Sequence, residues 1–261
     1  MNGVNKTLFI PLYGKSYVSK KGLFIEDKKA EEIWAAEGFK LKGKSKSKWL
    51  AYYMGIRSAV FDAWVESKMC SESGAVVIHI GCGLDSRVLR VGAFNQPWYD
   101  VDFPEVISER ERYFAQTDSY RMLEGDAREP RWLNDIPKAR HAVVVMEGVS
   151  MYLGNEELCA LFEALSERFE KISLLMDCYT VMAAKMSKYK NPINDVGVTM
   201  VYGLDDPTIV ERGGLRFINE HNMTPSEYVD QLRGMEKCIF RKIYAGSFAK
   251  KLYRLFEYEK A

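Results

Sequence analysis

Apolar residues at helical spacing predict a long helix that begins near Trp49. The stripe comprises Leu50, Tyr53, Met54, Val60, Phe61, Trp64 and Val65. Arg57 lies on the same stripe, four residues from both Tyr53 and Phe61. Because a guanidinium that faces a protein core is costly unless an anion meets it, we expect Arg57 to be buried and paired with an anion.

Beyond this helix, short apolar runs alternate with helical patterns. The runs predict strands at 75–80, at 97–101, just before Gly125, at 142–146, at 172–177, near 215–218 and near 252–258. Helices are expected over 86–91, from Pro104 to about Gln116, over 155–169, after the strand at 172–177, and from Thr224. Strands that alternate with helices indicate an α/β fold with one doubly wound, mostly parallel sheet.

The bulk composition narrows the class of protein. With 261 residues, 47% of them hydrophobic, the chain can build one sizeable α/β domain or two small ones. Lys plus Arg (37) nearly equals Asp plus Glu (36), so the net charge of +1 gives no long-range attraction to nucleic acid or to an anionic membrane. The alternating lysines from Lys40 to Lys48 are expected to form a solvated loop and not a nucleic-acid contact.

The cysteines and the N-terminal residues indicate a reduced, cytoplasmic protein. The five cysteines are scattered without a CxxC pair, so neither a zinc site nor a disulfide framework is expected. The first residues do not have the pattern of a secretory signal, and no apolar run approaches the ~18 residues of a membrane span. No metal site is expected either, because Asp205-Asp206 before Pro207 is typical of a turn.

Polar residues follow four successive predicted strands. Gly81-Cys82-Gly83 follows the first strand, Asp102 the second, Asp126 the third and Glu147 the fourth. In doubly wound sheets, ligands bind beyond the carboxyl ends of the strands. Packing alone does not explain a glycine turn or a carboxylate at four strand ends in a row, so we expect these residues to share a ligand site.

Some of these features also have a structural interpretation. The Gly81-Cys82-Gly83 turn suits a tight strand-to-helix corner as well as a close approach of backbone to a ligand. Asp102 can accept hydrogen bonds from both hydroxyls of a ribose, or it can cap the helix at Pro104. A nicotinamide cofactor shares these two features, but Asp85 would place a negative charge beside its pyrophosphate.

S-adenosylmethionine has no phosphate, and its groups match the polar residues at this edge. We expect Arg57 to meet its carboxylate, Asp102 its ribose and Asp126 its adenine amino group. Glu147 is an acid that can face the cationic end of the ligand. An edge rich in acids is unfavourable for a pyrophosphate and therefore favours the sulfonium cofactor.

Six segments resemble the leucine carboxyl methyltransferase superfamily and, within it, the bacterial polyketide O-methyltransferase-like branch. They are IPLYGKSY (10–17), HIGCGLDSR (79–87), YDVDFPEVI (99–107), GDAREPRWL (125–133), MEGVSMYL (146–153) and YGLDDP (202–207). The resemblance covers nearly the whole chain in the expected order. It implies a class I methyltransferase fold, Rossmann-like, with a seven-stranded sheet whose last strand is antiparallel. It also implies S-adenosylmethionine as the donor and S-adenosylhomocysteine as the product, with no metal.

The resemblance further implies roles for individual residues. Lys15 and Arg57 would hold the methionine carboxylate, Gly81 and Gly83 would line the methionine moiety, Asp102 would take the ribose, Asp126 with Ala127 the adenine, and Glu147 would lie beside the ammonium. Cys82 and Phe103 are implied as further cofactor-binding residues. The sequence departs from the family at Cys82, where Ala is usual, and at Ser86, where Thr is common. The implied organisation is one domain over 1–261: an N-terminal helical lid (1–72) and a core (73–261) with acceptor-pocket insertions after about residue 179.

Fewer residues are candidates for the methyl acceptor. Tyr13, Tyr152 and Tyr202 lie in the family-like segments and are expected to line or cover the acceptor, although aromatic packing explains them equally well. Tyr152, Tyr202 and His221 are the candidate catalytic residues, since His221 follows a predicted strand near the working edge.

The expected function is methyl transfer from S-adenosylmethionine to a hydroxyl or carboxyl oxygen of a small molecule, such as a polyketide-like metabolite. Three alternatives stay open: a protein C-terminal carboxyl methyltransferase, an NAD-dependent oxidoreductase, and an inactive cofactor-binding module. The sequence leaves open the oligomeric state and the choice between a hydroxyl and a carboxyl acceptor.

Overall fold

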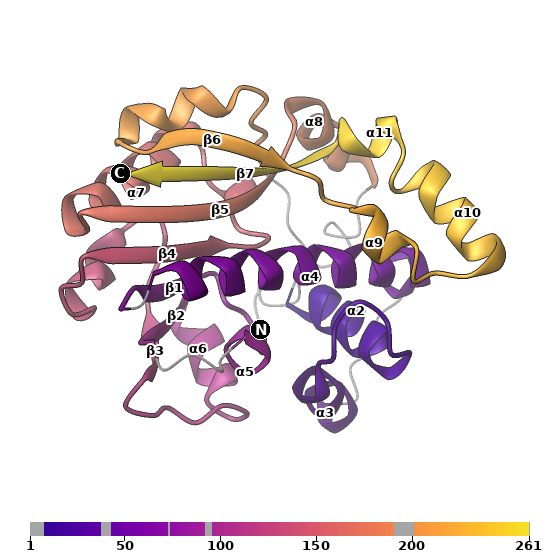
Figure 1. Cartoon of the computed structure of the whole chain (residues 1–261), viewed down its shortest axis with the longest axis horizontal. Coiled ribbons are helices and arrows are strands. Elements are labelled where there is room, and N and C mark those ends of the chain that lie inside the picture. Colours follow the sequence, from indigo (N-terminus) through magenta and orange to yellow (C-terminus); the bar gives the residue numbers. More distant parts are fainter. Residues whose placement is uncertain (1–7, 38–42, 73, 92–95, 191–200, 261) are drawn as a thin grey trace.

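The computed structural model describes residues 8–37, 43–72, 74–91, 96–190 and 201–260. Within these residues the strands form one seven-stranded sheet with the order β3-β2-β1-β4-β5-β7-β6 (Figure 1). The strands are β1 (Val76–Ile80), β2 (Trp98–Asp102), β3 (Tyr120–Glu124), β4 (His141–Met146), β5 (Lys171–Tyr179), β6 (Arg216–His221) and β7 (Tyr253–Lys260). β1 to β5 are parallel, and β7 is antiparallel to both β5 and β6. The doubly wound sheet with an antiparallel last strand is therefore confirmed.

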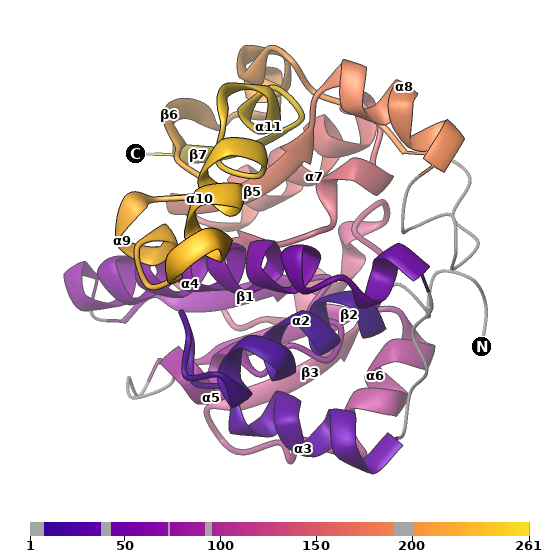
Figure 2. The ribbon, with the colours of Figure 1, turned by 90° about the vertical axis from the view of Figure 1, so that its right-hand side faces the viewer.

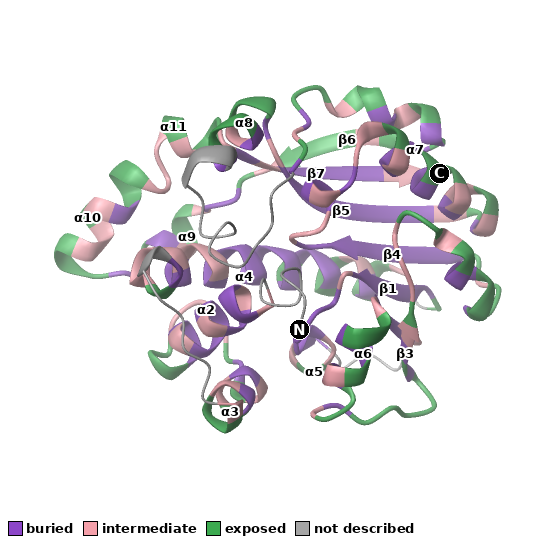
Figure 3. Cartoon of the chain, turned by 180° about the vertical axis from the view of Figure 1, so that it is seen from behind, coloured by how far each residue is buried: buried purple, intermediate pink, exposed green. Residues whose placement is uncertain are grey.

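Helices cover both faces of this sheet, with α4 across one face and α7 against the other (Figures 1 and 3). The helices of the described residues are α2 (Phe9–Lys20), α3 (Lys28–Glu37), η1 (Gly43–Lys46), α4 (Lys48–Ser71), α5 (Arg87–Val91), α6 (Pro104–Arg110), η2 (Pro130–Asp135), η3 (Ser150–Tyr152), α7 (Asn155–Arg168), α8 (Val181–Lys190), η5 (Pro207–Gly213), α9 (Ser226–Val229), α10 (Gly234–Ile243) and α11 (Ser247–Lys250). None of these helices combines the length and apolar character needed to cross a membrane.

Every residue of β1 is buried, as predicted for a strand covered on both faces. Val77 belongs to a core that includes Ile56 and Phe61 of α4. Ile78, its neighbour, belongs to a second core that includes Phe162 of α7. The strand thus alternates between two cores, and its carboxyl end is held rigidly where the glycine turn begins.

Several predicted boundaries need correction. The helix from Pro104 ends at Arg110 and not near Gln116, because the chain turns there and brings Phe114 under the Arg110 guanidinium, 4.0 Å from the ring centroid. β5 continues two residues past its predicted end, to Tyr179, since Tyr179 still pairs with Tyr253 of β7.

The lysine-rich stretch is also more ordered than predicted. Residues 43–46 form the short helix η1, and Lys48 is the first residue of α4. The Ser47 hydroxyl accepts a hydrogen bond from the Trp49 backbone N–H and so caps α4. Lys40 and Lys42 lie outside the described residues.

Buried ion pairs connect the N-terminal helices to the sheet. Arg90 of α5 contacts Asp27, just before α3, at 2.6 Å and Asp62 of α4 at 2.7 Å. The Asp27 carboxylate also accepts a hydrogen bond from the Ala30 backbone N–H at the start of α3. These pairs hold α4 and the start of α3 against α5. The N-terminal helices lie at the end of the sheet where β1, β4 and β5 finish (Figure 1).

Candidate functional site

A cavity of about 640 Å³ lies at the carboxyl ends of β1, β4 and β5. Figure 2 views the molecule toward this end, where α2, α4, α10 and α11 gather. The wall contains four charged residues, Lys15, Arg57, Asp85 and Glu147; the turn Gly81, Cys82 and Gly83; and five tyrosines, Tyr53, Tyr152, Tyr179, Tyr244 and Tyr253. The volume is typical of a small-molecule site.

The glycine turn requires its glycines. Gly81 has φ +67° and Gly83 has φ +52°, a left-handed conformation that other residues rarely adopt. A Cβ atom on Gly81 would lie 2.1 Å from a methyl carbon of Val149. The turn therefore brings bare backbone to the cavity wall.

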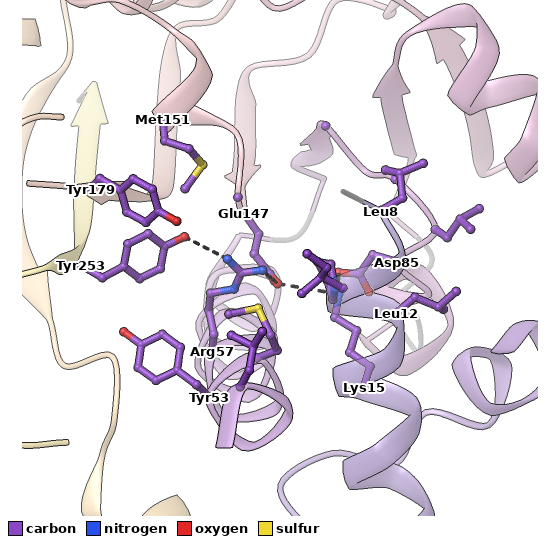
Figure 4. Close-up of a pocket in the computed structure, with 18 of the residues that line it drawn as sticks. Leu8, Leu12, Lys15, Tyr53, Arg57, Asp85, Glu147, Met151, Tyr179 and Tyr253 are labelled. Carbon is purple, nitrogen blue, oxygen red and sulfur yellow. Dashed lines mark hydrogen bonds and ion pairs between the residues drawn. The ribbon is translucent and has the colours of Figure 1, made fainter. Parts of the chain in front are cut away.

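Glu147 is at the centre of the charged part of the wall (Figure 4). Its carboxylate contacts Arg57 at 3.0 Å and Lys15 at 3.7 Å, and it is paired with Arg87. Burial by itself raises the pKa of Glu147, but the three cations outweigh burial and hold the pKa well below its usual range. Glu147 is therefore an anion inside the cavity wall.

Arg57 is 4% exposed, so its predicted burial is confirmed. The anions that it meets are the protein's own: Glu147, and Asp177 at 3.0 Å. The guanidinium also donates to the Tyr253 hydroxyl at 2.9 Å. Its Nε atom is buried and has no hydrogen-bonding partner among the described residues. One donor of Arg57 thus remains for a ligand.

Lys15 is 3% exposed and is therefore buried, although lysines usually lie at the surface. Its ammonium lies 2.6 Å from Asp85. Asp85 also accepts a hydrogen bond from the Arg87 backbone N–H at the start of α5. Burial raises the pKa of Asp85, but the nearby Arg90, Lys15 and Arg87 lower it by more than burial raises it. The pKa therefore lies well below its usual range, and the carboxyl is ionised.

The residues predicted for the nucleoside lie next to this cavity but not on its wall. Asp102, at the end of β2, accepts hydrogen bonds from the backbone N–H groups of Gly83 and Phe103, each at 2.8 Å. Burial raises the pKa of Asp102 to about 6 despite these hydrogen bonds. Because Gly83 belongs to the cavity wall, Asp102 is one hydrogen bond away from the cavity, and it lies further along the same edge of the sheet.

Asp126 and Ala127 follow β3, one strand further along the edge. The Asp126 carboxylate is paired with Arg128 at 2.7 Å and is partly exposed. The expectation that Arg57, Gly81, Glu147, Asp102 and Asp126 all line one cavity is therefore correct only for the first three. The two aspartates lie outside that cavity, further along the same edge of the sheet.

The candidate acceptor residues likewise divide into one that lies on the cavity wall and others that do not. Tyr152 lies on the cavity wall, whereas Tyr13 and Tyr202 do not. Tyr13 packs on Trp34 at 5.1 Å between ring centroids, and Tyr202 is 41% exposed. His221 is the last residue of β6 rather than a residue after it; it lies off the cavity wall, and its Nε2 contacts Glu257 at 2.6 Å.

Sequence reasoning did not find Asp177 or four of the wall tyrosines, Tyr53, Tyr179, Tyr244 and Tyr253. Tyr53 was assigned only to the apolar stripe of α4. Tyr179 and Tyr253 face the cavity because β5 and β7 pair as far as these two residues. Pairing between distant strands gives no local sequence signal.

The fold and the site together define a class I methyltransferase: the sheet order, the antiparallel β7, the glycine turn after β1 and the acid after β2. The chain belongs to the leucine carboxyl methyltransferase family, whose model matches residues 5–166. It is an S-adenosylmethionine-dependent methyltransferase.

Two relatives and one solved structure illustrate the similarity. The tetracenomycin polyketide synthesis O-methyltransferase TcmP of Streptomyces glaucescens is 30% identical over 204 residues, 76% of each chain. The S-adenosyl-L-methionine-dependent methyltransferase dpfgK of Gibberella zeae is 25% identical over 183 residues, 64% of this chain and 61% of that one. The magnesium protoporphyrin IX methyltransferase of Synechocystis PCC 6803, solved with bound SAH, superposes with a TM-score of 0.53 at 13% identity, over 88% of this chain and 93% of that chain. This last likeness concerns the fold alone.

Proposed function

We propose that the protein transfers a methyl group from S-adenosylmethionine to a hydroxyl or carboxyl oxygen of a small molecule. The observation that carries the proposal is the alternation of buried cations and carboxylates beside the glycine turn. The amino acid end of the cofactor is a zwitterion, and Lys15, Arg57 and Glu147 offer both signs of charge within one wall. The names of the two relatives describe methyltransferases, and one of them acts in polyketide synthesis.

The residues present fit this cofactor. The buried, unpartnered Nε of Arg57, together with Lys15, suits the methionine carboxylate, and Glu147 suits the ammonium. The wall formed by Gly81, Cys82 and Gly83 suits the methionine chain. The remaining residues would hold the nucleoside: Asp102 the ribose hydroxyls, Phe103 and Ala127 the adenine ring, and Asp126 the adenine amino group.

The ionised Asp85 disfavours a nicotinamide cofactor. It lies on the cavity wall directly after the glycine turn, where a pyrophosphate would have to bind. Two like charges close together in a buried site repel each other strongly. A protein carboxyl acceptor is the second candidate, because the matching family is named for leucine carboxyl methylation.

The chain contributes to catalysis by positioning the acceptor and the cofactor and by excluding water. When bound, S-adenosylmethionine supplies the activated methyl group. Holding the acceptor oxygen in line with that methyl can contribute ~7–11 kcal/mol to the rate enhancement. A carboxylate acceptor is already ionised at neutral pH, whereas a phenol, with a pKa of about 10, benefits from a nearby base.

The proposal is tested by incubating the protein with methyl-labelled S-adenosylmethionine and a metabolite extract, followed by mass spectrometry. We expect at least one small molecule to gain the label, and Asp102→Ala to abolish this transfer. Label found only on protein C-termini would support the second candidate and contradict the first. An absence of labelled product, although the cofactor binds, would indicate an inactive binding module.

Cofactor affinity should depend on pH through Asp102. Its pKa of about 6 means that the carboxylate, which accepts both ribose hydroxyls, is lost as the pH falls below this value. The dissociation constant of S-adenosylhomocysteine should therefore rise about tenfold between pH 7 and pH 5. Isothermal titration calorimetry at several pH values measures this change.

Protonation of Asp102 does not unfold the protein, so unfolding would not explain such a loss of affinity. Folding raises the pKa of Asp102 above its ordinary value of 3.8, so protonating it between pH 6 and 4 stabilises the folded state. Asp102→Asn is the matched control and should bind weakly with no pH dependence in this range. The same pH profile in Asp102→Asn and in the wild type would show that another group titrates.

A further inference from the structure

The cavity has a second end, which differs in chemistry from the charged one. Figure 4 shows Tyr53, Tyr179, Tyr253 and Met151 on one side of Arg57 and Glu147, with Lys15 and Asp85 on the other. We call the part of the wall formed by Tyr53, Tyr179 and Tyr253 the aromatic end. Its residues come from α4, β5 and β7, three elements that are distant in sequence.

The rings of the aromatic end brace one another. The Tyr253 ring centroid lies 5.1 Å from that of Tyr179 and 6.2 Å from that of Tyr53, with interplanar angles of 60° and 50°. Tilted rings at this spacing attract one another and lose little freedom when a ligand arrives. The three rings are thus a preorganised surface of aromatic faces and edges.

Two charged residues, Asp177 and Arg57, fix the hydroxyl of Tyr253. It donates to Asp177 at 2.6 Å and accepts from Arg57 at 2.9 Å. Burial, followed by the charge of Asp177, holds the pKa of Tyr253 well above its usual range, so the phenol keeps its proton. This hydroxyl locks the ring in place.

The hydroxyl of Tyr53 makes no hydrogen bond to any described residue. Burial raises the pKa of this phenol, so it also stays protonated and can donate. Tyr53 is partly exposed on the cavity wall, so its hydroxyl is free to donate a hydrogen bond to an oxygen of the acceptor. The neighbouring wall is apolar and includes Met54, Met151 and Leu252. Methionine thioethers adapt their shape and pack well against aromatic rings.

We propose that the methyl acceptor binds at the aromatic end as a flat aromatic ring system, with an oxygen hydrogen-bonded to the Tyr53 hydroxyl. This inference rests on the proposed function, since the charged end must be taken by the cofactor. A flat aromatic ring can stack on these tyrosines or meet them edge to face, whereas a saturated ring of similar size makes no such aromatic contact.

The test compares matched probes on the protein saturated with S-adenosylhomocysteine. The probes are 2-naphthol, 2-naphthoic acid and the saturated analogue decahydro-2-naphthol, with binding measured by calorimetry. We expect at least one naphthalene probe to bind tenfold or more tightly than the saturated one. Tyr179→Leu should weaken this binding at least tenfold, and Tyr53→Phe, which keeps the ring, should weaken it about threefold to tenfold.

Tyr13→Leu is the control, because Tyr13 lies outside the cavity. It should leave probe binding unchanged, and all three variants should retain the wild-type affinity for S-adenosylhomocysteine and a cooperative thermal transition. Equal binding of the saturated probe, no binding of either naphthalene probe, or an equal loss in Tyr13→Leu and Tyr179→Leu would overturn the inference. Failure of the wild type to bind S-adenosylhomocysteine would instead overturn the proposed function.

Discussion

Glu147→Gln is expected to lower the free energy of unfolding by about 3–5 kcal/mol. The carboxylate is buried against Lys15, Arg57 and Arg87, and an amide of the same shape leaves these three cations without their shared anion. The same substitution should weaken cofactor binding, since the proposed partner of the methionine ammonium is lost. Urea unfolding and calorimetry measure the two effects separately.

An exposed ion pair provides the matched control for Glu147→Gln. Glu170 contacts Arg140 at 3.3 Å, with both side chains more than three-quarters exposed. Glu170→Gln should change the free energy of unfolding by less than about 1 kcal/mol, because solvent screens an exposed pair. If the two variants were equally stable, Glu147 would not be the centre of a buried charge cluster.

The pH dependence of stability gives a second readout on Glu147. Its pKa in the folded protein is lowered from an ordinary value of 4.5, so its contribution to stability is complete above that pH and is lost as the pH falls further. Wild-type stability should therefore decline below about pH 4.5, and Glu147→Gln should decline less over the same range.

Gly81→Ala is expected to cost stability and to abolish cofactor binding. The left-handed backbone at φ +67° costs a non-glycine residue about 1–2 kcal/mol, and the new methyl group lies 2.1 Å from Val149, an overlap that costs a further ~1–3 kcal/mol. Relieving the overlap must move the turn that faces the cofactor. Thermal unfolding and S-adenosylhomocysteine titration are the measurements.

Gly22 separates the two causes. Its φ of +64° matches that of Gly81, but an added Cβ would contact nothing within 4 Å. Gly22→Ala should therefore show only the backbone cost and should bind the cofactor normally. Val149→Ala, added to Gly81→Ala, removes the overlapping methyl group and should recover part of the stability. If Gly81→Ala bound the cofactor as well as Gly22→Ala does, the turn would not be part of the cofactor site.

The parts of the site that depend on local pattern could be predicted from the sequence. The stripe of α4 predicted the burial of Arg57, and the apolar runs placed Gly81, Asp102 and Glu147 at strand ends, as the structure shows. These features depend on periodicity and on the general placement of ligands in parallel sheets. The family resemblance added Lys15, which lacks such a local signal.

The remaining parts of the site depend on contacts between segments that are distant in the sequence. Arg57 and Tyr253 are 196 positions apart, and only the insertion of β7 between β5 and β6 brings them together. No periodicity predicts that the anion facing Arg57 includes Asp177, or that Asp126 pairs with Arg128 instead of entering the cavity. The aromatic end was therefore the least predictable part of the cavity.

The most direct test of the account is a crystal structure of the protein with S-adenosylhomocysteine. We predict that the amino acid end lies in the cavity beside Lys15 and Glu147, that the chain passes over Gly81, and that Asp102 accepts hydrogen bonds from the ribose. A ligand bound elsewhere, or one whose ribose makes no contact with Asp102, would contradict the proposed path from the charged cavity to the nucleoside.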